Sequence, residues 1–200
     1  GYNKFMTTPE IGLREQILVT AKSLFIQQGY HGLAMRQISD AVGVSKAALY
    51  YHFKDKEELF LAILSGNLNE IESAIDTIRA KQISYSEQIT MFVEYVLKQP
   101  TEHRAIIRLA SQEMSQLSAT ARKKFDRTYH DQFTGKLQAI FQAGVENGEF
   151  RPIDSAIATW ALLGMMYPYF YPAHTGAMPL RPEIISQIIS IYLIGVKQPG

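Results

Sequence analysis

The sequence contains no cysteine and only one tryptophan among its 200 residues. Without cysteine, neither a disulfide framework nor a thiolate metal site can form, which fits a reducing compartment and favours a cytoplasmic protein. The five histidines are scattered along the chain, so a metal site would need ligands from distant segments. We therefore expect neither a metal nor a cofactor. Internal repeats and low-complexity tracts are also absent.

Motifs of catalysis are missing as well. The sequence has no glycine-rich phosphate loop, no serine nucleophile elbow and no pair of histidines in an HExxH arrangement. His130-Asp131 is most simply an exposed pair. We therefore expect a protein that is not an enzyme.

Long apolar runs are few, and none predicts a membrane span. The segment from Ser155 to Ala173 carries no charge, but it contains two prolines and three tyrosines. The next apolar run, Ile184 to Val196, is too short to cross a hydrocarbon core of ~30 Å. We expect both to be buried in protein–protein contacts, with no membrane partner. The short polar stretch from Gly1 to Met6 predicts no secretory signal.

The net charge is only +1, but charge is unevenly distributed along the chain. Between Arg14 and Lys56 there are six lysines and arginines against three acids, whereas the rest of the chain has 14 against 16. A basic N-terminal part on a slightly acidic remainder is typical of a phosphate-binding module joined to another domain.

The stretch from Met35 to Phe53 predicts two short helices joined by a tight turn. Gly43 stands where the first helix should end, because glycine enters the left-handed region without strain. Ser45 is a suitable N-cap for the second helix, and Leu49 is expected to pin it to the first. Such a pair is a helix-turn-helix, whose second helix can lie in the major groove of DNA. An ordinary helical hairpin with a solvated basic face is the alternative.

A further helix should begin just beyond, because Asp55 and Glu58 have the spacing of a capping box. A lysine at the N-terminus of such a helix suits a phosphate. Lys46 is expected to reach a base edge or a phosphate, and Tyr51 either contacts DNA or belongs in part to the core. The predicted DNA-binding residues are Arg36, Ser45, Lys46, Ala47, Tyr50, Tyr51, His52 and Lys56.

The run from Ile17 to Leu64 resembles the N-terminal domain of the TetR family of bacterial transcriptional regulators. The matching segments are IL-x-x-A-x-x-LF from Ile17, GY at Gly29, VGVS from Val42 and LYYHF-x-x-K-x-x-LF from Leu49. Similar proteins usually carry a Thr-Thr or Thr-Ser pair before the first helix of the motif, where this sequence has Leu33-Ala34. The hydroxyl cap and a phosphate contact often supplied there are therefore missing. The resemblance covers about the first third of the chain.

Helical periodicity along the chain predicts an all-α fold of about nine helices. The expected domains are a three-helix DNA-binding head over residues 11–66 and a larger ligand-binding and dimerisation body over residues 67–200. We expect the first helix to start at residues 8–10 and a helix over residues 56–81 to belong to both domains. Gly135 should bend a long helix that Gly148 ends. The last two helices are expected over residues 153–173 and 182–197.

Soft and aromatic side chains are frequent in the body, which suits a cavity for a small apolar molecule. Most of them must form the core, and no single one stands out from it. Arg104 and Arg108, one turn apart, either hold an acidic ligand group or form surface ion pairs. The candidate ligand-binding residues are Phe92, Tyr95, Met114, Phe125, Tyr129, Phe133, Met166, Tyr169 and Phe170.

The last two helices are apolar on more than one side, so each must bury more than one side. Two such helices from each of two chains would form a four-helix bundle, and the family resemblance also implies a homodimer. Ile191 and Ile194 are also apolar, but they lie outside the main row of apolar residues that recurs at helical spacing along the last helix. The predicted dimer interface consists of Ile157, Ala161, Gly164, Ile185, Ile188, Ile189, Tyr192 and Val196.

Together these features predict a DNA-binding transcriptional regulator. Paired recognition helices would meet a pseudo-palindromic operator ~34 Å apart. The resemblance implies a repressor most often, released by a small apolar or aromatic effector. A ligand-independent activator or DNA organiser on the same scaffold is the alternative, and a helical binding protein or enzyme with a vestigial head is a third reading. The sequence identifies neither the effector, nor the operator, nor the regulated genes.

Overall fold

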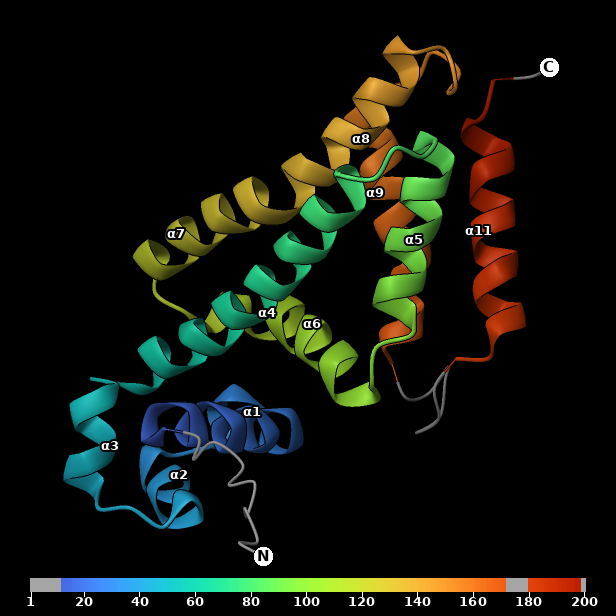
Figure 1. Ribbon diagram of the computed structural model, residues 1–200. Coiled ribbons are helices and arrows are strands. Elements are labelled where there is room, and N and C mark those ends of the chain that lie inside the picture. Colours follow the sequence, from blue (N-terminus) through green and yellow to red (C-terminus); the bar gives the residue numbers. More distant parts are fainter. Residues whose placement is uncertain (1–11, 172–179, 199–200) are drawn as a thin grey trace, which may run out of the picture. The chain divides into compact units, whose positions relative to one another are not determined.

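A computed structural model describes residues 12–171 and 180–198, and all regular structure within them is helical (Figure 1). No strand occurs in these ranges, where Phe150 and Lys197 form one isolated antiparallel bridge. Nine helices are described when α7 and α8 are counted as one continuous helix, which confirms the all-α fold. None of the helices in these ranges is both long and apolar enough to cross a membrane. The helix start expected at residues 8–10 lies outside the described residues.

The chain divides into two compact units, the first ending at Ile63 and the second beginning at Leu64. We call them the head and the body. The head contains α1 (Leu13–Gly32), α2 (Met35–Val42), α3 (Lys46–His52) and the start of α4 (Lys56–Arg79), which continues in the body. All four helices contribute fully buried side chains to the core of the head, namely Ile17, Phe25, Ile38, Leu49 and Phe60.

Local residues set the geometry of the helix-turn-helix. Gly43 ends α2 in the left-handed region with a φ of 79°, and its N–H donates to carbonyls in the last turn of α2. The Ser45 hydroxyl accepts the N–H of Ala48 at 3.1 Å and so caps α3. At the start of α4, the Asp55 carboxylate accepts the N–H of Glu58 at 2.8 Å. The caps predicted at these three positions are confirmed.

The body contains the rest of α4 and six further α-helices. They are α5 (Tyr85–Leu97), α6 (Thr101–Glu113), α7 (Ala119–Tyr129), α8 (Gly135–Glu146), α9 (Ser155–Met166) and α11 (Pro182–Val196). α5 packs against α8 and α11, and α9 packs against the same two helices. A capping box opens α5, because the Ser84 hydroxyl accepts the N–H of Glu87 at 3.2 Å and the Glu87 carboxylate accepts the N–H of Ser84 at 2.9 Å.

The bend predicted at Gly135 takes the form of a π-helical turn. Residues His130–Thr134 (η2) form this turn and join α7 to α8. A Cβ on Gly135 would lie 2.9 Å from the backbone oxygen of His130, so glycine leaves room for the wider turn. α8 then ends at Glu146, just before Gly148, which has a φ of 77°.

Two helices of the body end in a 3₁₀ turn, and for α9 this end comes earlier than the predicted end at residue 173. α6 stops at Glu113 and is followed by a 3₁₀ turn, Met114–Gln116 (η1). α9 stops at Met166 and is followed by another, Tyr167–Phe170 (η3). Pro168 accounts for the second end, because proline has no N–H to donate to the carbonyl of the preceding turn. Tyr167 and Phe170 are thereby placed on a tighter turn than a continued α-helix would give.

Four residues predicted for the dimer interface belong instead to the core of the body. Ile185, Ile188, Tyr192 and Val196 are buried within the single chain, and the Tyr192 hydroxyl donates to a backbone carbonyl of α9 at 2.6 Å. Ile189 is half-buried. The large apolar residues of α11 that face solvent are the two outside the predicted interface, Ile191 and Ile194. In a helix that is apolar on all sides, the sequence periodicity does not indicate which side packs against the rest of the same chain.

Candidate DNA-binding surface and ligand cavity

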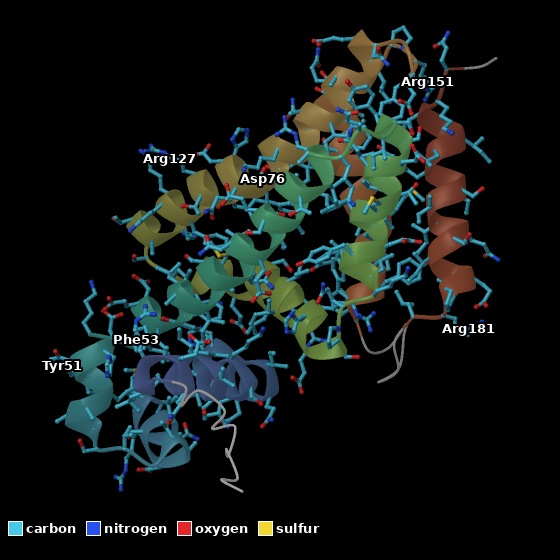
Figure 2. All side chains as sticks on the ribbon, in the orientation of Figure 1. Tyr51, Phe53, Asp76, Arg127, Arg151 and Arg181 are labelled. Carbon is cyan, nitrogen blue, oxygen red and sulfur yellow. The ribbon has the colours of Figure 1, made fainter. Side chains whose placement is uncertain are left out.

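α3 turns one side to the core of the head and the other to solvent. Leu49 is fully buried and holds the helix in place, whereas Tyr51 is 86% exposed. Figure 2 shows the Tyr51 side chain on the outer side of α3. Lys46 and Ala47 are also exposed. Tyr51 is therefore not a core residue, and the exposed side of α3 is free to enter a groove of DNA.

A shallow hollow lies beside α3 within the head. Cationic side chains from three helices border it: Arg36 of α2, Lys46 of α3 and Lys56 of α4. The Arg36 guanidinium lies 3.8 Å from the Asp40 carboxylate, but both side chains are largely exposed, so this pair is weak. A concave surface bordered by several cations suits a phosphate group. The bordering residues are His31, Gly32, Leu33, Ala34, Met35, Arg36, Lys46, Tyr50 and Lys56.

The Lys56 ammonium is bound by the protein itself. Its Nζ donates to the carbonyl oxygens of Tyr30 at 2.6 Å and Leu33 at 2.9 Å, and it lies 4.4 Å from the centre of the Tyr30 ring. These carbonyls stand at the end of α1 and in the link to α2, where intrahelical partners are lacking. Lys56 therefore joins α4 to the end of α1. We assign it a positioning role in place of the predicted contact with the DNA backbone.

The start of α2 shows the consequence of the Leu33-Ala34 pair. Ala34 occupies the N-cap without any side-chain hydrogen bond. The Gln37 side chain reaches back and accepts the N–H of Ala34 at 2.8 Å, which leaves half of a capping box. Leu33 is buried in the head. This helix start therefore relies on an apolar contact and on Gln37 where a hydroxyl would otherwise cap it.

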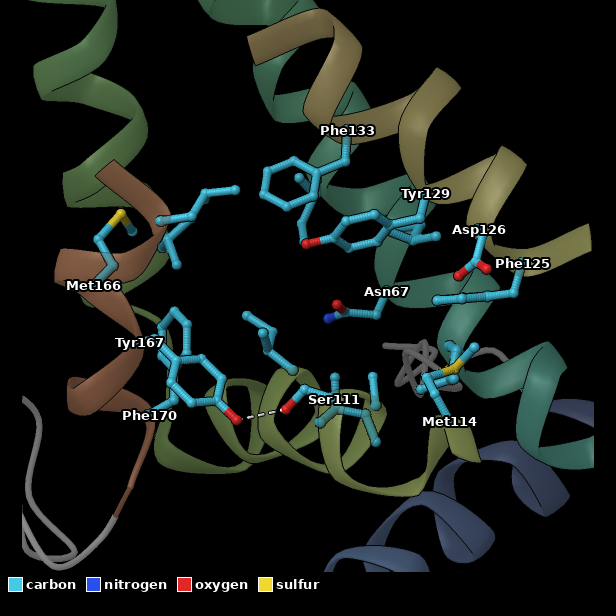
Figure 3. A pocket seen from close by; sticks show the side chains of 18 of the residues that line it. Asn67, Ser111, Met114, Phe125, Asp126, Tyr129, Phe133, Met166, Tyr167 and Phe170 are labelled. Atoms are coloured by element: carbon cyan, nitrogen blue, oxygen red, sulfur yellow. Dashed lines mark hydrogen bonds between the residues drawn. The ribbon is translucent and has the colours of Figure 1, made fainter. Parts of the chain in front are cut away.

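The body encloses a cavity of about 400 Å³ (Figure 3). Its walls come from α4, α5, α6, η1, α7, the π turn, α9 and η3. Apolar and aromatic side chains dominate, as is typical of a site for a small apolar molecule. The lining residues are Leu64, Asn67, Leu68, Ile71, Phe92, Val96, Ile106, Ile107, Ala110, Ser111, Met114, Phe125, Asp126, Tyr129, Phe133, Trp160, Leu163, Gly164, Met166, Tyr167 and Phe170.

Few polar groups interrupt this apolar wall. The hydroxyl of Tyr129 and the amide of Asn67 point into the cavity (Figure 3). Burial raises the pKa of Tyr129 to about 12, so its phenol stays protonated and can donate a hydrogen bond. The hydroxyls of Ser111 and Tyr167 lie 2.7 Å apart and bind each other. The cavity therefore offers a small number of fixed polar contacts within an apolar space.

A second apolar surface is exposed on α9 and α11. Ile157 and Trp160 of α9 and Ile191 and Ile194 of α11 are each more than half exposed. The two helices pack against each other, so the four side chains belong to adjacent surfaces. A Cβ placed on Gly164 would meet nothing within 4 Å, so the surface beside it is open. Exposed apolar surface of this kind marks a contact with another protein.

Comparison with known proteins decides the family. The family described as "Bacterial regulatory proteins, tetR family" matches residues 17–63, and "Tetracyclin repressor-like, C-terminal domain" matches residues 82–169. The solved TetR-family regulator PfmR from Thermus thermophilus is 30% identical, with a TM-score of 0.76 over 91% of this chain and 99% of that chain. The chain belongs to the TetR family.

Two further proteins are similar over nearly the whole length. The transcriptional repressor KstR2 from Rhodococcus jostii strain RHA1 is 25% identical over 194 residues, 96% of this chain and 95% of that protein. AibR, solved in complex with isovaleryl coenzyme A and operator DNA, is 23% identical with a TM-score of 0.74 over 94% of this chain and 100% of that chain. TetR-family proteins are transcriptional regulators and not enzymes, so this chain is a DNA-binding regulator.

The TetR-type head gathers some of the predicted DNA-binding residues around the hollow and leaves others outside it. Arg36, Lys46, Tyr50 and Lys56 border the hollow. Ser45, Ala47, Tyr51 and His52 lie elsewhere on α3 or at its N-cap. Sequence reasoning did not include His31, which borders the hollow from the end of α1. Its place directly after the Gly29-Tyr30 motif was the available signal.

Most of the predicted ligand-binding residues line the TetR-type cavity, but two do not. Tyr95 borders a separate hollow beside α4 and α5, and its hydroxyl donates to the Glu70 carbonyl at 3.5 Å. Tyr169 uses its own carbonyl to accept a hydrogen bond from the buried Arg104 at 2.9 Å. Neither Arg104 nor Arg108 is among the described lining residues. Lining residues with polar groups or an indole that the sequence did not indicate include Asn67, Ser111, Asp126 and Trp160.

Proposed function

We propose that this chain is a repressor that binds a pseudo-palindromic operator as a homodimer and leaves it when a small apolar effector enters the body. The main support for this proposal is the cavity of about 400 Å³ in the body. Close-packed protein interiors have few voids larger than a water molecule, so a cavity of this size favours a bound ligand. AibR, which has the same fold, was solved in complex with isovaleryl coenzyme A and operator DNA, so a protein of this fold binds both a small molecule and DNA. We expect the regulator to act in the cytoplasm, where bacterial DNA lies.

α4 supports a link between effector and operator. Phe60, near its start, is buried in the core of the head, and Leu64, Asn67 and Ile71 farther along line the cavity. A ligand that binds one arrangement of α4 more tightly than another shifts the population between a DNA-binding and a released form. The size of the shift is limited by the difference between the two affinities.

The exposed surface of α9 and α11 supports the homodimer, which is the usual state of TetR-family regulators. Pairing of this surface about a two-fold axis would assemble α9 and α11 of both copies into a four-helix bundle. The proposed interface keeps Ile157, Ala161 and Gly164 of the predicted set. On α11 the proposed interface uses the exposed Ile191 and Ile194 in place of the predicted residues, most of which are buried within the single chain.

The homodimer is tested by placing a charge in the proposed interface. Ile194→Glu should convert the protein to a monomer in light-scattering measurements and abolish operator binding, because a buried unpaired carboxylate opposes association. Val19→Glu is the matched control, since Val19 is also a β-branched, exposed apolar residue on a helix but lies on α1 of the head. An Ile194→Glu protein that remains dimeric would exclude this interface.

The DNA-binding surface is tested by selection from random DNA with the full chain. We expect an enriched pseudo-palindrome, and each of Arg36→Ala and Lys46→Ala should weaken binding and flatten its salt dependence by about one phosphate contact. Arg151→Ala, which removes an exposed cation from the body (Figure 2), should bind as the wild type does. Enrichment of no palindrome, or wild-type affinity for both head variants, would refute the assignment.

The effector role is tested by thermal shift against a compound library, followed by gel shift on the selected operator. A true effector raises the melting temperature because it binds the folded state, and it then dissociates the operator complex. If every compound that raises the melting temperature leaves the complex intact, the chain is a ligand-independent regulator and the release step is wrong.

A further inference from the structure

The cavity of the body is poorly suited to an anionic ligand. Among its described lining residues there is no lysine, arginine or histidine, and Asp126 is the one side chain with a formal charge. A carboxylate or phosphate buried there would lose its hydration without gaining a cationic partner. Asp126 itself is exposed, so water screens its attraction for a cation. The charge distribution therefore favours a neutral molecule.

Tyr129 is fixed in the wall of the cavity. Its ring meets the Phe133 ring edge-on at a centroid distance of 5.2 Å and lies 6.1 Å from the Phe125 ring. Its hydroxyl has no hydrogen-bond partner within the described part of the chain, and it points into the cavity (Figure 3). A donor left unpaired by an apolar ligand costs free energy, so a ligand with an acceptor at this place is favoured.

The hydroxyls of Ser111 and Tyr167 are less available to a ligand than the hydroxyl of Tyr129. Ser111 donates its one hydroxyl hydrogen to the Arg108 carbonyl at 2.8 Å. Tyr167, 2.7 Å from the Ser111 oxygen, must therefore be the donor in that pair. Because both hydrogens are already used within the protein, these hydroxyls offer a ligand only lone pairs. An acceptor oxygen on the ligand is thus directed to Tyr129 and not to Ser111.

We propose that the effector of this cavity is a neutral, largely apolar molecule with a hydrogen-bond-accepting oxygen, of the ketone, ester or alcohol type, that meets the Tyr129 hydroxyl. This inference rests on the proposed effector role and adds the chemical class to it. The Asn67 amide, which also points into the cavity, provides both a donor and an acceptor for a second polar contact.

The test uses four probes with matched ten-carbon chains: decan-2-one, decanoate, decylammonium and decane. Trp160 is the only tryptophan and lines the cavity, so its fluorescence reports binding at this place in the full-length protein. At neutral pH the ketone should bind about tenfold more tightly than decanoate or decylammonium, because both ions must be desolvated without a buried partner. Tighter binding of either ion than of the ketone would overturn the proposal, as would the absence of saturable ketone binding.

Tyr129→Phe isolates the hydrogen bond, since it removes one oxygen atom and keeps the ring. Ketone affinity should fall about five- to tenfold and decane affinity should not fall. Tyr95→Phe is the matched control, because Tyr95 belongs to the body but borders a different hollow, and it should leave ketone binding unchanged. An equal loss in both variants, or no loss in Tyr129→Phe, would exclude the assigned contact.

Operator release separates this inference from the proposed function. If decan-2-one binds in a Tyr129-dependent manner but never dissociates the operator complex, the ligand class stands and the release mechanism fails. If decanoate binds more tightly than the ketone and dissociates the complex, the release mechanism stands and the ligand class fails.

Discussion

Replacement of Lys56 by methionine would remove its ammonium while keeping most of the side-chain stem. The variant loses hydrogen bonds of 2.6 Å and 2.9 Å to the Tyr30 and Leu33 carbonyls and the contact with the Tyr30 ring. Hydrogen bonds from a charged donor contribute about 1.5–3 kcal/mol each, and an exposed cation–π contact about 0.5–1 kcal/mol. Because Lys56 is only half-buried, solvent weakens these contacts, and we expect Lys56→Met to reduce the free energy of unfolding by about 2–4 kcal/mol.

Urea unfolding followed by circular dichroism measures this loss, and gel shift on the selected operator measures DNA affinity. Lys46→Met is the control, because Lys46 is exposed on α3. It should change stability by less than about 0.5 kcal/mol while weakening DNA binding. If Lys56→Met instead keeps wild-type stability and loses affinity as Lys46→Met does, the ammonium binds phosphate and the positioning role is wrong.

Three further substitutions follow from the packing. Ala34→Thr should supply the missing N-cap hydroxyl of α2 and raise the free energy of unfolding by about 1 kcal/mol in urea titrations; no gain would show that Gln37 already caps the helix. Gly144→Ala should lower the free energy of unfolding by about 1–3 kcal/mol, because the added Cβ would overlap the buried Phe150 ring. Gly66→Ala, with open space around the added Cβ, should not lower it. Equal effects of the two substitutions would contradict this packing. Burial alone would raise the pKa of Glu149, but hydrogen bonds from the N-terminus of α5 outweigh it and lower that pKa below the usual range of a glutamate. The stability from Glu149 is therefore present above the unfolded pKa and lost as pH falls through the folded pKa, so Glu149→Gln should flatten the acid limb of the pH–stability curve; an unchanged limb would exclude this cause.

The parts of the fold that the sequence predicts are those fixed by contacts within a few residues. Gly43, Ser45 and the Asp55–Glu58 pair act on backbone groups three or four positions away, so their types and spacing are sufficient. The π turn was indicated as a bend by Gly135, although its exact form depends on the room left beside the His130 carbonyl.

Features set by distant contacts were not accessible in this way. The partners of Lys56 lie on residues 30 and 33, so nothing in its own surroundings distinguishes a lysine that binds carbonyls from one that binds phosphate. The buried side of α11 depends on α5 and α9, and its uniformly apolar sequence fits either orientation. Tyr129 and Tyr95 are both half-buried tyrosines on helices, and only the tertiary structure shows that the first faces the cavity.

The π turn gives the proposed effector a route to α4 that does not depend on apolar contact alone. Gln132, within the turn, donates to the Glu72 carboxylate of α4 at 2.8 Å, and Lys136, just after it, lies 2.6 Å from the Asp76 carboxylate and 2.9 Å from that of Glu72. Tyr129 directly precedes the turn, so a ligand that displaces Tyr129 acts on the segment that carries these bonds. Packed helices shift as rigid units between discrete arrangements, and the partly exposed ion pairs of Lys136 add a smaller, solvent-screened contribution. Under the proposed function, a small movement at the Tyr129 wall is therefore converted into a choice between two positions of α4 and is not absorbed as gradual deformation.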